Sequence, residues 1–232
     1  MDSYCDEIGI ILSGRTYIYR MLKHVFGHEP NLQLIETLTG EFTEEALALF
    51  LDDEQLAPYN KLFAKIKNSI SGNSEATLEC IKSEYTNLML GPYKLPAPPW
   101  ESVYVNKVRL IFQKSTLKVR QAYLEYNLLP SEYPHVPDDH IAIELDFMLR
   151  LGQFCQESFV KSDAQRFHKI LSDQKLFLEN HILVWIYDFA EQIQQSKTHH
   201  FYPQMASLTA NILQADYNII EELEELLSTI VS

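Results

Sequence analysis

Apolar residues recur at intervals of three, four and seven positions along most of the chain, and this spacing constrains the fold more than any other feature. Such spacing gathers apolar side chains on one face of an α-helix. It is clearest in residues 3–27, where the recurring positions are Ile8, Ile11, Leu12, Tyr19, Leu22 and Phe26. No segment of useful length alternates apolar and polar residues as a half-buried strand would. The sequence therefore predicts an all-α fold.

Capping and breaking residues place the other helices. After the first helix, the sequence predicts helices at residues 42–51, 55–70, 73–90, 115–128, 137–160, 164–171, 175–194, 202–213 and 216–230. The pair Gly91-Pro92 ends one of them. Pro137, followed by Asp138 and Asp139, suits a helix start, because proline fits the first turn and acidic residues complement the helix dipole.

Two proline-rich connections lie in the middle of the chain. Seven of the ten prolines fall between Pro92 and Pro137, on either side of the helix expected at residues 115–128. Long connections inside a compact protein are usually functional or disordered. The first contains Tyr93, Trp100 and Tyr104, and large aromatic residues are depleted in disordered segments. We therefore expect both connections to be ordered loops.

The size of the chain bounds the number of domains. It has 232 residues, of which 46% are hydrophobic, enough to bury one sizeable core. It has only 7 glycines and shows neither a low-complexity segment nor an internal repeat, which disfavours a flexible multidomain chain or a solenoid. We therefore expect residues 1–232 to form a single all-helical domain.

The net charge limits the kinds of partner that the protein can bind, and its cysteines indicate the cellular compartment. The formal net charge is -13, which disfavours nucleic acid because phosphates require cationic contacts; a cationic or apolar partner fits better. The first residues are acidic, unlike a signal peptide, and no apolar run approaches the ~18 residues of a membrane helix. The three cysteines form no CxxC pair, which is typical of reduced thiols. We expect a cytoplasmic protein without stable membrane insertion.

Local signatures of common enzyme classes are missing from the sequence. It contains no GxGxxG, GxxxxGK[ST], HExxH or GxSxG motif. His24 and His28 are spaced to share one helix face, but Gly27 interrupts that turn and no third metal ligand is placed nearby. His199 and His200 lie in a polar connection and are expected at the surface. The sequence predicts no catalytic residue, no metal ion and no cofactor.

Titratable residues crowd at one place, Asp138-Asp139-His140. As chemistry, the acidic residues would raise the pKa of the histidine and could form a metal or general-base site, although helical phosphohydrolases have histidine before aspartate. As structure, Asp139 and His140 would cap the following helix. As a binding surface, the carboxylates would face arginine side chains of a peptide. The residues alone leave the last two interpretations open.

Two stretches together resemble the TorD/DmsD/NarJ family of redox-enzyme maturation chaperones. The first is EYTNLMLGP at residues 84–92 with LPAPPWESVY at residues 95–104, similar to the family's aromatic-x-x-Leu-Phe helix end and its proline–tryptophan loop. The second is VPDDH at residues 136–140, similar to the Glu-Pro-x-Asp-His motif. Two positions depart from the family pattern: Met89 stands where phenylalanine is usual, and Val136 replaces the glutamate. Weaker similarity covers residues 176–189 and 201–202.

The resemblance implies a TorD-like helical bundle that acts in the assembly of molybdenum enzymes. Members of the family bind the twin-arginine signal peptide of a molybdopterin-dependent reductase and delay its export until the cofactor is inserted. The implied client is the apo form of a catalytic subunit like that of DMSO, TMAO or nitrate reductase. The chaperone would be a monomer or a domain-swapped dimer.

We expect the two stretches to converge on one groove that is apolar beside acidic. Leu88, Met89 and Trp100 would take the apolar part of the signal peptide, and Asp138 and Asp139 would face its arginines. The residues expected to bind the peptide are Tyr85, Leu88, Met89, Pro99, Trp100, Glu101, Tyr104, Pro137, Asp138, Asp139 and His140.

Two other functions compete with this interpretation. A helical metal-dependent hydrolase would use Asp139 and His140, and it would lose turnover in a folded His140→Ala variant. A general helical scaffold or regulatory protein is the second alternative, and if it bound DNA it would need a basic recognition helix, which the sequence does not show. An apolar groove edged by carboxylates distinguishes the chaperone from both.

Overall fold

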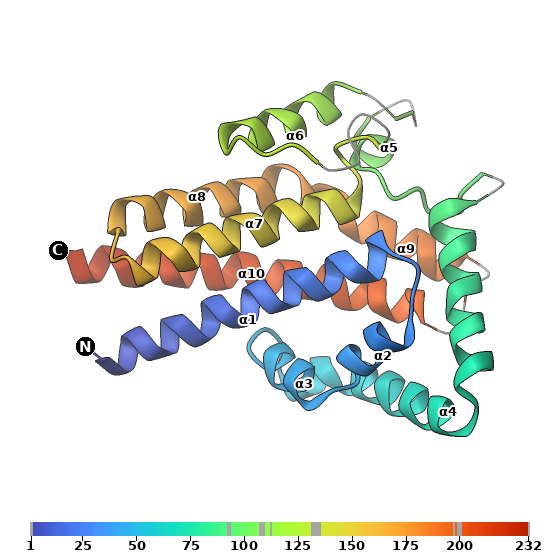
Figure 1. Cartoon of the computed structure of the whole chain (residues 1–232). Coiled ribbons are helices and arrows are strands. Elements are labelled where there is room, and N and C mark those ends of the chain that lie inside the picture. Colours follow the sequence, from blue (N-terminus) through green and yellow to red (C-terminus); the bar gives the residue numbers. More distant parts are fainter. Residues whose placement is uncertain are drawn as a thin grey trace.

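The computed structural model describes residues 2–91, 94–106, 110–111, 113–130, 136–196, 198 and 201–231. Within these residues the chain is helical and contains no β-strand, so the predicted all-α fold is confirmed (Figure 1). None of the helices in the described part is both long and apolar enough to cross a membrane. Pro92, Tyr93 and residues 131–135 of the proline-rich connections lie outside the described residues, as do His199 and His200.

Four long helices form the centre of the molecule: α1 (Asp2–Gly27), α7 (Ile141–Val160), α8 (Ala164–Asn180) and α10 (Tyr202–Val231). Helix α1 packs along α7, α7 packs against α8, and α8 packs against α10. Successive neighbours run in opposite directions, which brings both chain termini to the same end of the group (Figure 1). The apolar stripe predicted for residues 137–160 lies in the resulting core, where Ile141, Leu145, Met148 and Cys155 are fully buried.

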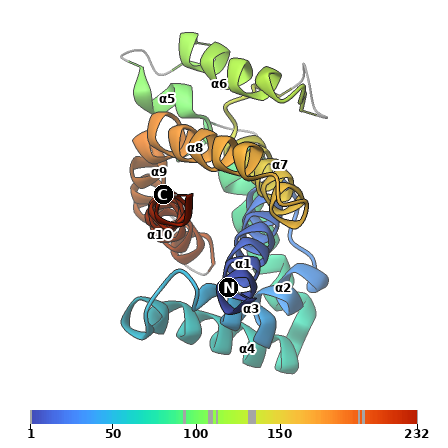
Figure 2. The same cartoon turned by 90° about the vertical axis from the view of Figure 1, so that its left-hand side faces the viewer.

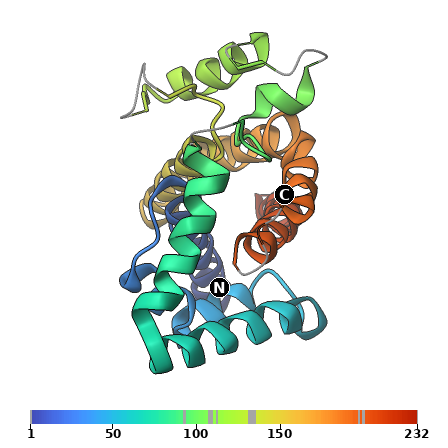
Figure 3. The same cartoon turned by 90° about the vertical axis from the view of Figure 1, so that its right-hand side faces the viewer.

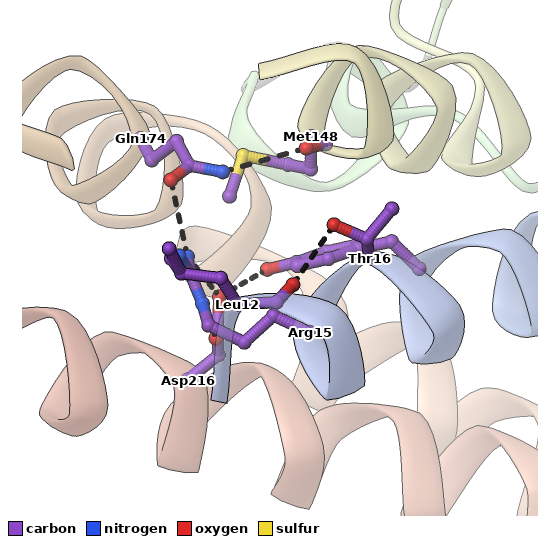
Figure 4. Close-up of polar contacts among 7 residues, drawn as sticks. Leu12, Arg15, Thr16, Met148, Gln174 and Asp216 are labelled. Atoms are coloured by element: carbon purple, nitrogen blue, oxygen red, sulfur yellow. Dashed lines mark hydrogen bonds and ion pairs between the residues drawn. The ribbon is translucent and has the colours of Figure 1, made fainter. Parts of the chain in front are cut away.

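A buried polar cluster joins three of these helices (Figure 4). The guanidinium of Arg15 in α1 lies 2.5 Å (Nε) from Asp216 Oδ1 in α10, and its Nη2 donates to Gln174 Oε1 in α8 at 3.2 Å. The hydroxyl of Tyr19 donates to Asp216 Oδ2 at 2.6 Å. The two helices predicted at residues 202–213 and 216–230 are therefore wrong, because Asp216 is a buried ion-pair partner in the middle of one helix, α10.

Helices α2 (Leu32–Leu38), α3 (Glu41–Leu47) and α4 (Asp53–Tyr85) lie on one side of the central group, and α5 (Glu101–Val105) and α6 (Lys114–Glu125) lie on the opposite side (Figures 2 and 3). Neither α2 nor α5 was predicted. Helix α4 replaces the separate helices predicted at residues 55–70 and 73–90. The break expected between them is a kink, where Asn73 has non-helical angles (φ -156, ψ 90) and its side chain accepts a bond from Ala76 N.

The end of α4 follows the prediction closely. A π-helical turn, Thr86–Leu90, continues it, and Gly91 then takes a positive φ of 68° that favours glycine. The amide of Gly91 donates to the carbonyl of Thr86 at 2.8 Å, which closes the turn. The chain therefore leaves the bundle at the position where Gly91-Pro92 was expected to end the helix.

The boundary between the next two helices was predicted in the wrong place. Helix α8 continues to Asn180, past the break expected near residues 172–174, and α9 (Ile186–Gln195) begins only after a 3₁₀ turn at Ile182–Val184. The turn is flanked by His181 and Trp185, whose side chains bond to distant carboxylates. These tertiary contacts leave no local signal in the sequence.

Candidate functional site

The two proline-bordered segments lie side by side. Trp100 and His140 form an isolated antiparallel β-bridge, and Glu101 N donates to the carbonyl of Asp139 at 3.0 Å. The rings of Trp100 and His140 meet edge to face, with centroids 5.6 Å apart. Segments 40 residues apart in the sequence are therefore joined through both their backbones and their side chains, at the junction of α5 and α7 (Figure 1).

The turn before α7 is fixed by hydrogen bonds. His140 N donates to the carbonyl of Pro137 at 3.2 Å, and Ile141 N donates to the carbonyl of Pro99 at 2.9 Å. His140 Nδ1 accepts from Ala142 N at 3.1 Å, so His140 caps α7, as predicted. The prediction that Asp139 also caps α7 is wrong, because its carboxylate accepts from Ser102 N of α5 instead. Desolvation lowers the pKa of His140 to about 4, so the ring is neutral at pH 7 and can accept this bond. Helix α7 begins at Ile141 rather than Pro137.

Both aspartates of the motif are fully buried. Asp139 Oδ2 accepts from Ser102 N at 2.8 Å and so holds the start of α5. Asp138 Oδ2 accepts from Arg120 of α6, at 2.7 Å from Nε and 2.5 Å from Nη2. The carbonyl of Asp138 accepts from the hydroxyl of Tyr123 at 2.9 Å. In this conformation neither carboxylate faces solvent, and both already bind groups of the protein itself.

Two further buried carboxyl groups, Glu101 and Glu144, lie near the aspartates. Glu101 Oε2 is 3.0 Å from His181 Nδ1, and Glu144 Oε2 accepts from Trp185 Nε1 at 3.2 Å. Burial, and then the negative charges of Glu101 and Asp139, raise the pKa of Glu144 well above its usual value. A raised pKa favours the protonated form of Glu144, which reduces the repulsion among these groups.

Buried polar atoms without hydrogen-bond partners gather in the same two segments. They include Trp100 Nε1, Ser102 Oγ, Asp138 Oδ1 and Asp139 Oδ1, judged over the part of the chain that the structure describes. Each such atom costs about 1–3 kcal/mol when it is left unpaired. Natural folds keep these atoms few, so their concentration beside the bridge marks a region that is not optimised for stability alone.

An apolar cleft of about 480 Å³ opens beside Trp100. Apart from Lys94 and Gln192, the residues that line it are apolar: Leu95, Pro96, Pro98, Trp100, Val103, Leu110 and Ile111. Leu110 and Ile111 are 57% and 41% exposed. Small-molecule and side-chain pockets usually measure about 300–1,000 Å³ and have mostly apolar walls. The cleft has the size and character of a site for apolar side chains.

The rim of the cleft continues onto α9. The hydroxyl of Tyr104 donates to Gln192 Oε1 at 3.4 Å, and its ring stacks on Trp185 with centroids 5.3 Å apart. Asp188 is exposed one turn before Gln192, so the two residues share a face of α9. The exposed carboxylate of Asp188 therefore lies close to the rim of the cleft.

The eleven residues expected to bind a peptide fall into three groups. Trp100 lines the cleft, while Tyr104 and His140 are half-buried beside it. A second group is buried between the cleft and the bundle: Pro99, Glu101, Pro137, Asp138 and Asp139. A third group, Tyr85, Leu88 and Met89, packs into the hydrophobic core and does not line the cleft. The binding role of all of them stays a prediction.

Several residues of this region were not predicted from the sequence. Leu95, Pro96 and Pro98 belong to the proline–tryptophan loop, so the motif itself was a usable signal for them. Arg120, His181 and Trp185 had no such signal, because each reaches the motif from a different helix.

The described residues do not support a hydrolase. None of their clusters of His, Cys, Asp and Glu side chains is arranged so that three or more of them could hold a metal ion. The rings of His24 and His28 are 4.5 Å apart but form an edge-to-face pair rather than a complete ligand set. Asp139 and His140, the residues proposed for that alternative, bind backbone amides of the protein.

Comparisons with known proteins agree with the fold and the motifs. The family model of the nitrate reductase delta subunit matches residues 40–191, more than half of the chain. A relative from Haemophilus influenzae, "Probable Tat proofreading chaperone DmsD", is 30% identical over 196 residues, which cover 84% of this chain and 86% of the relative. The chaperone protein TorD of Vibrio cholerae is 26% identical over 218 residues, with 94% and 97% coverage.

A solved structure supports the fold. The crystal structure described as "Putative Redox Enzyme Maturation Protein" from Archaeoglobus fulgidus aligns with a TM-score of 0.52 and 18% identity, covering 86% of this chain and 93% of that chain. At this identity the likeness concerns the fold alone. The family model and the identity with the Haemophilus influenzae relative carry the assignment: the chain belongs to the TorD/DmsD/NarJ family of redox-enzyme maturation chaperones, and it is not an enzyme.

Proposed function

We propose that this chaperone works in the cytoplasm and binds the twin-arginine signal peptide of a molybdopterin-dependent reductase catalytic subunit. It would hold the apo-subunit until the cofactor is inserted and the subunit can be exported. The observation that carries the proposal is the apolar cleft beside Trp100, formed by the family's proline–tryptophan loop. The names of the relatives, a Tat proofreading chaperone and TorD chaperones, support the same function.

The cleft suits the apolar part of such a peptide. A signal peptide carries an apolar stretch of about 7–15 residues, and each large side chain buried from it contributes about 1.5–3 kcal/mol. Trp100 lines the cleft, and the exposed side chains of Leu110 and Ile111 offer apolar surface for this contact. After the cost of ordering a flexible peptide, several such contacts give an affinity around micromolar, or about -8 kcal/mol. A chaperone with this affinity can release its client readily.

Charge supports the cationic part of the proposal. The net charge of -13 attracts a cationic peptide, and the exposed Asp188 lies close to the rim of the cleft. Trp100, Tyr104 and His140 would contact the peptide. Tyr85, Leu88 and Met89 would hold the helix end that carries the proline–tryptophan loop, because they are buried in the core.

The test is calorimetry of the purified protein with a synthetic twin-arginine signal peptide and with an Ala-Ala version. We expect Trp100→Ala to weaken binding of both peptides at least tenfold, because it removes the bulkiest side chain that lines the cleft. Phe42→Ala on α3 is the matched control, since Phe42 is a 62% exposed aromatic residue outside the cleft.

Thermal unfolding of each variant separates loss of binding from loss of folding. Equal affinities of wild type and a folded Trp100→Ala variant would exclude the cleft as the site. No binding of any reductase signal peptide from the same organism by the wild type would overturn the proposed function.

A further inference from the structure

We propose that Arg120 is an internal competitor for the client. In the free protein the guanidinium of Arg120 pairs with the carboxylate of Asp138. When the signal peptide binds, one of its arginines takes the place of Arg120 at this carboxylate. The inference rests on the proposed function and deepens it. It explains how a carboxylate buried in this structure can still serve a cationic ligand.

The geometry of the pair permits an exchange. The Asp138 side chain is 0% exposed, whereas the Arg120 side chain is 30% exposed. Arg120 therefore reaches from the surface of α6 to a carboxylate inside the protein. Its flexible side chain can turn outward into water without any movement of the main chain. The path that Arg120 vacates leads to Asp138.

The internal pair is incomplete, which leaves an advantage for an incoming arginine. Both Nε and Nη2 of Arg120 contact the same oxygen, Asp138 Oδ2. Asp138 Oδ1 is buried and has no hydrogen-bond partner among the described residues. A guanidinium can bind both oxygens of a carboxylate at once, and such two-point pairs are the stronger ones. A client arginine in that geometry would also satisfy Oδ1.

Asp138 is connected to the apolar cleft through a short series of contacts. It lies two residues before His140, whose ring packs against Trp100, and Trp100 lines the cleft. We infer that a peptide whose apolar stretch fills the cleft extends past Trp100 and His140 toward the Arg120–Asp138 pair. Asp139 Oδ1, also buried without a partner among the described residues, lies in the same turn.

The position of α6 fits this role. The helix lies on the outside of the bundle (Figures 1 and 2), and few of its side chains are buried, chiefly Val119 and Tyr123 on its inner face. Tyr123 bonds to the carbonyl of Asp138, so α6 can stay in place while the Arg120 side chain withdraws. The exchange then requires the movement of one side chain and does not require α6 to unfold.

The test compares Arg120→Gln with wild type in calorimetry against the Arg-Arg and Ala-Ala peptides. We expect Arg120→Gln to bind the Arg-Arg peptide about tenfold more tightly, because the competing guanidinium is gone, and the Ala-Ala peptide with unchanged affinity. Lys118→Gln is the matched control: it removes one exposed cation from the same helix, and it should bind both peptides like the wild type.

A second pair of variants keeps the test decisive if Arg120→Gln folds poorly. Arg120→Lys retains a cation but loses the planar guanidinium, and it should show a smaller gain for the Arg-Arg peptide. In an Asp138→Asn background the Arg-Arg preference should disappear, and Arg120→Gln should then change nothing. Circular dichroism and thermal unfolding verify folding in each case.

The outcomes separate the inference from the function on which it rests. If wild type binds the Arg-Arg peptide but folded Arg120 variants bind it equally or more weakly, the inference is overturned and the proposed function stands. If neither wild type nor Arg120→Gln binds any twin-arginine peptide, both fall. Binding of the Arg-Arg peptide that is about tenfold tighter in Arg120→Gln than in wild type, with equal binding of the Ala-Ala peptide, would support the inference.

Discussion

Glu144 shows how one buried residue shapes the site. It is fully buried in the first turn of α7 and bonds to Trp185 across 41 residues of sequence. Burial, and then the charges of Glu101 and Asp139, raise its pKa, which favours its neutral form beside these two carboxyl groups. The buried carboxyl groups therefore form a fixed support for the bridge between Trp100 and His140 rather than a set of free bases.

Glu144→Gln should make the protein more stable than wild type as the pH rises. The pKa of Glu144 is higher in the folded state than its usual value of 4.5, so above that pH the unfolded chain loses this proton first and wild type loses stability. Glutamine is always neutral and avoids the loss, which amounts to at most about 1.4 kcal/mol per pH unit. Urea unfolding of both proteins between about pH 5 and pH 8 measures the difference.

Glu157→Gln is the matched control, because Glu157 is an exposed glutamate on the same helix. A difference between Glu144→Gln and wild type that stays constant over this pH range would show that Glu144 is ionised in the folded protein.

The sequence predicted helices correctly where their polar residues face water. It misplaced helix boundaries where polar residues instead bind partners within the protein. The stripes of α1 and α7 follow simple spacing, and both helices were predicted. Breaks between helices were predicted at residues 172–174 and 214–215, at or beside Asp173 and Asp216. In the structure Asp173 accepts from the hydroxyl of Tyr126, and Asp216 binds Arg15. Sequence spacing cannot reveal a partner 201 residues away.

Arg15→Met should destabilise the protein by about 3–5 kcal/mol, because it leaves the buried carboxylate of Asp216 without its cation. The change would loosen three helices at once, since Arg15 connects α1 with α8 and α10 (Figure 4). Urea unfolding measures the free energy of unfolding.

Arg20→Met is the control, because Arg20 is exposed on the same helix and should change stability little. The double variant Arg15→Met, Asp216→Asn removes both charges and should recover part of the loss. A single Arg15→Met variant as stable as wild type would mean that the cluster adds nothing to the cohesion of the bundle.

At the scale of the whole molecule, the sequence predicted which segments lie together. It did not predict which side chains of other helices bury them. The two motifs were expected to converge, and the bridge between Trp100 and His140 joins them. The burial of Asp138 could not be foreseen, because Arg120 comes from the helix between the motifs and has no motif of its own. Likewise, Leu88 has helical spacing that fits a binding stripe and a core stripe equally well.

The acidity of the whole chain should govern how fast a cationic signal peptide arrives. With a net charge of -13, the protein attracts the peptide over distances that salt shortens to about 10 Å at 0.1 M. We expect the association rate constant of the Arg-Arg peptide to fall several-fold between about 50 and 500 mM salt, with a nearly constant dissociation rate constant. Stopped-flow fluorescence with a labelled peptide measures both.

The Ala-Ala peptide separates long-range attraction from contact in the cleft. It lacks the two cations but keeps the apolar stretch, so its association rate should depend much less on salt. Because the Arg120–Asp138 pair acts only after the peptide arrives, Arg120→Gln should leave the salt dependence of association almost unchanged and act through slower dissociation. Equal salt dependence for both peptides would show that the acidic surface takes no part in recruiting the client.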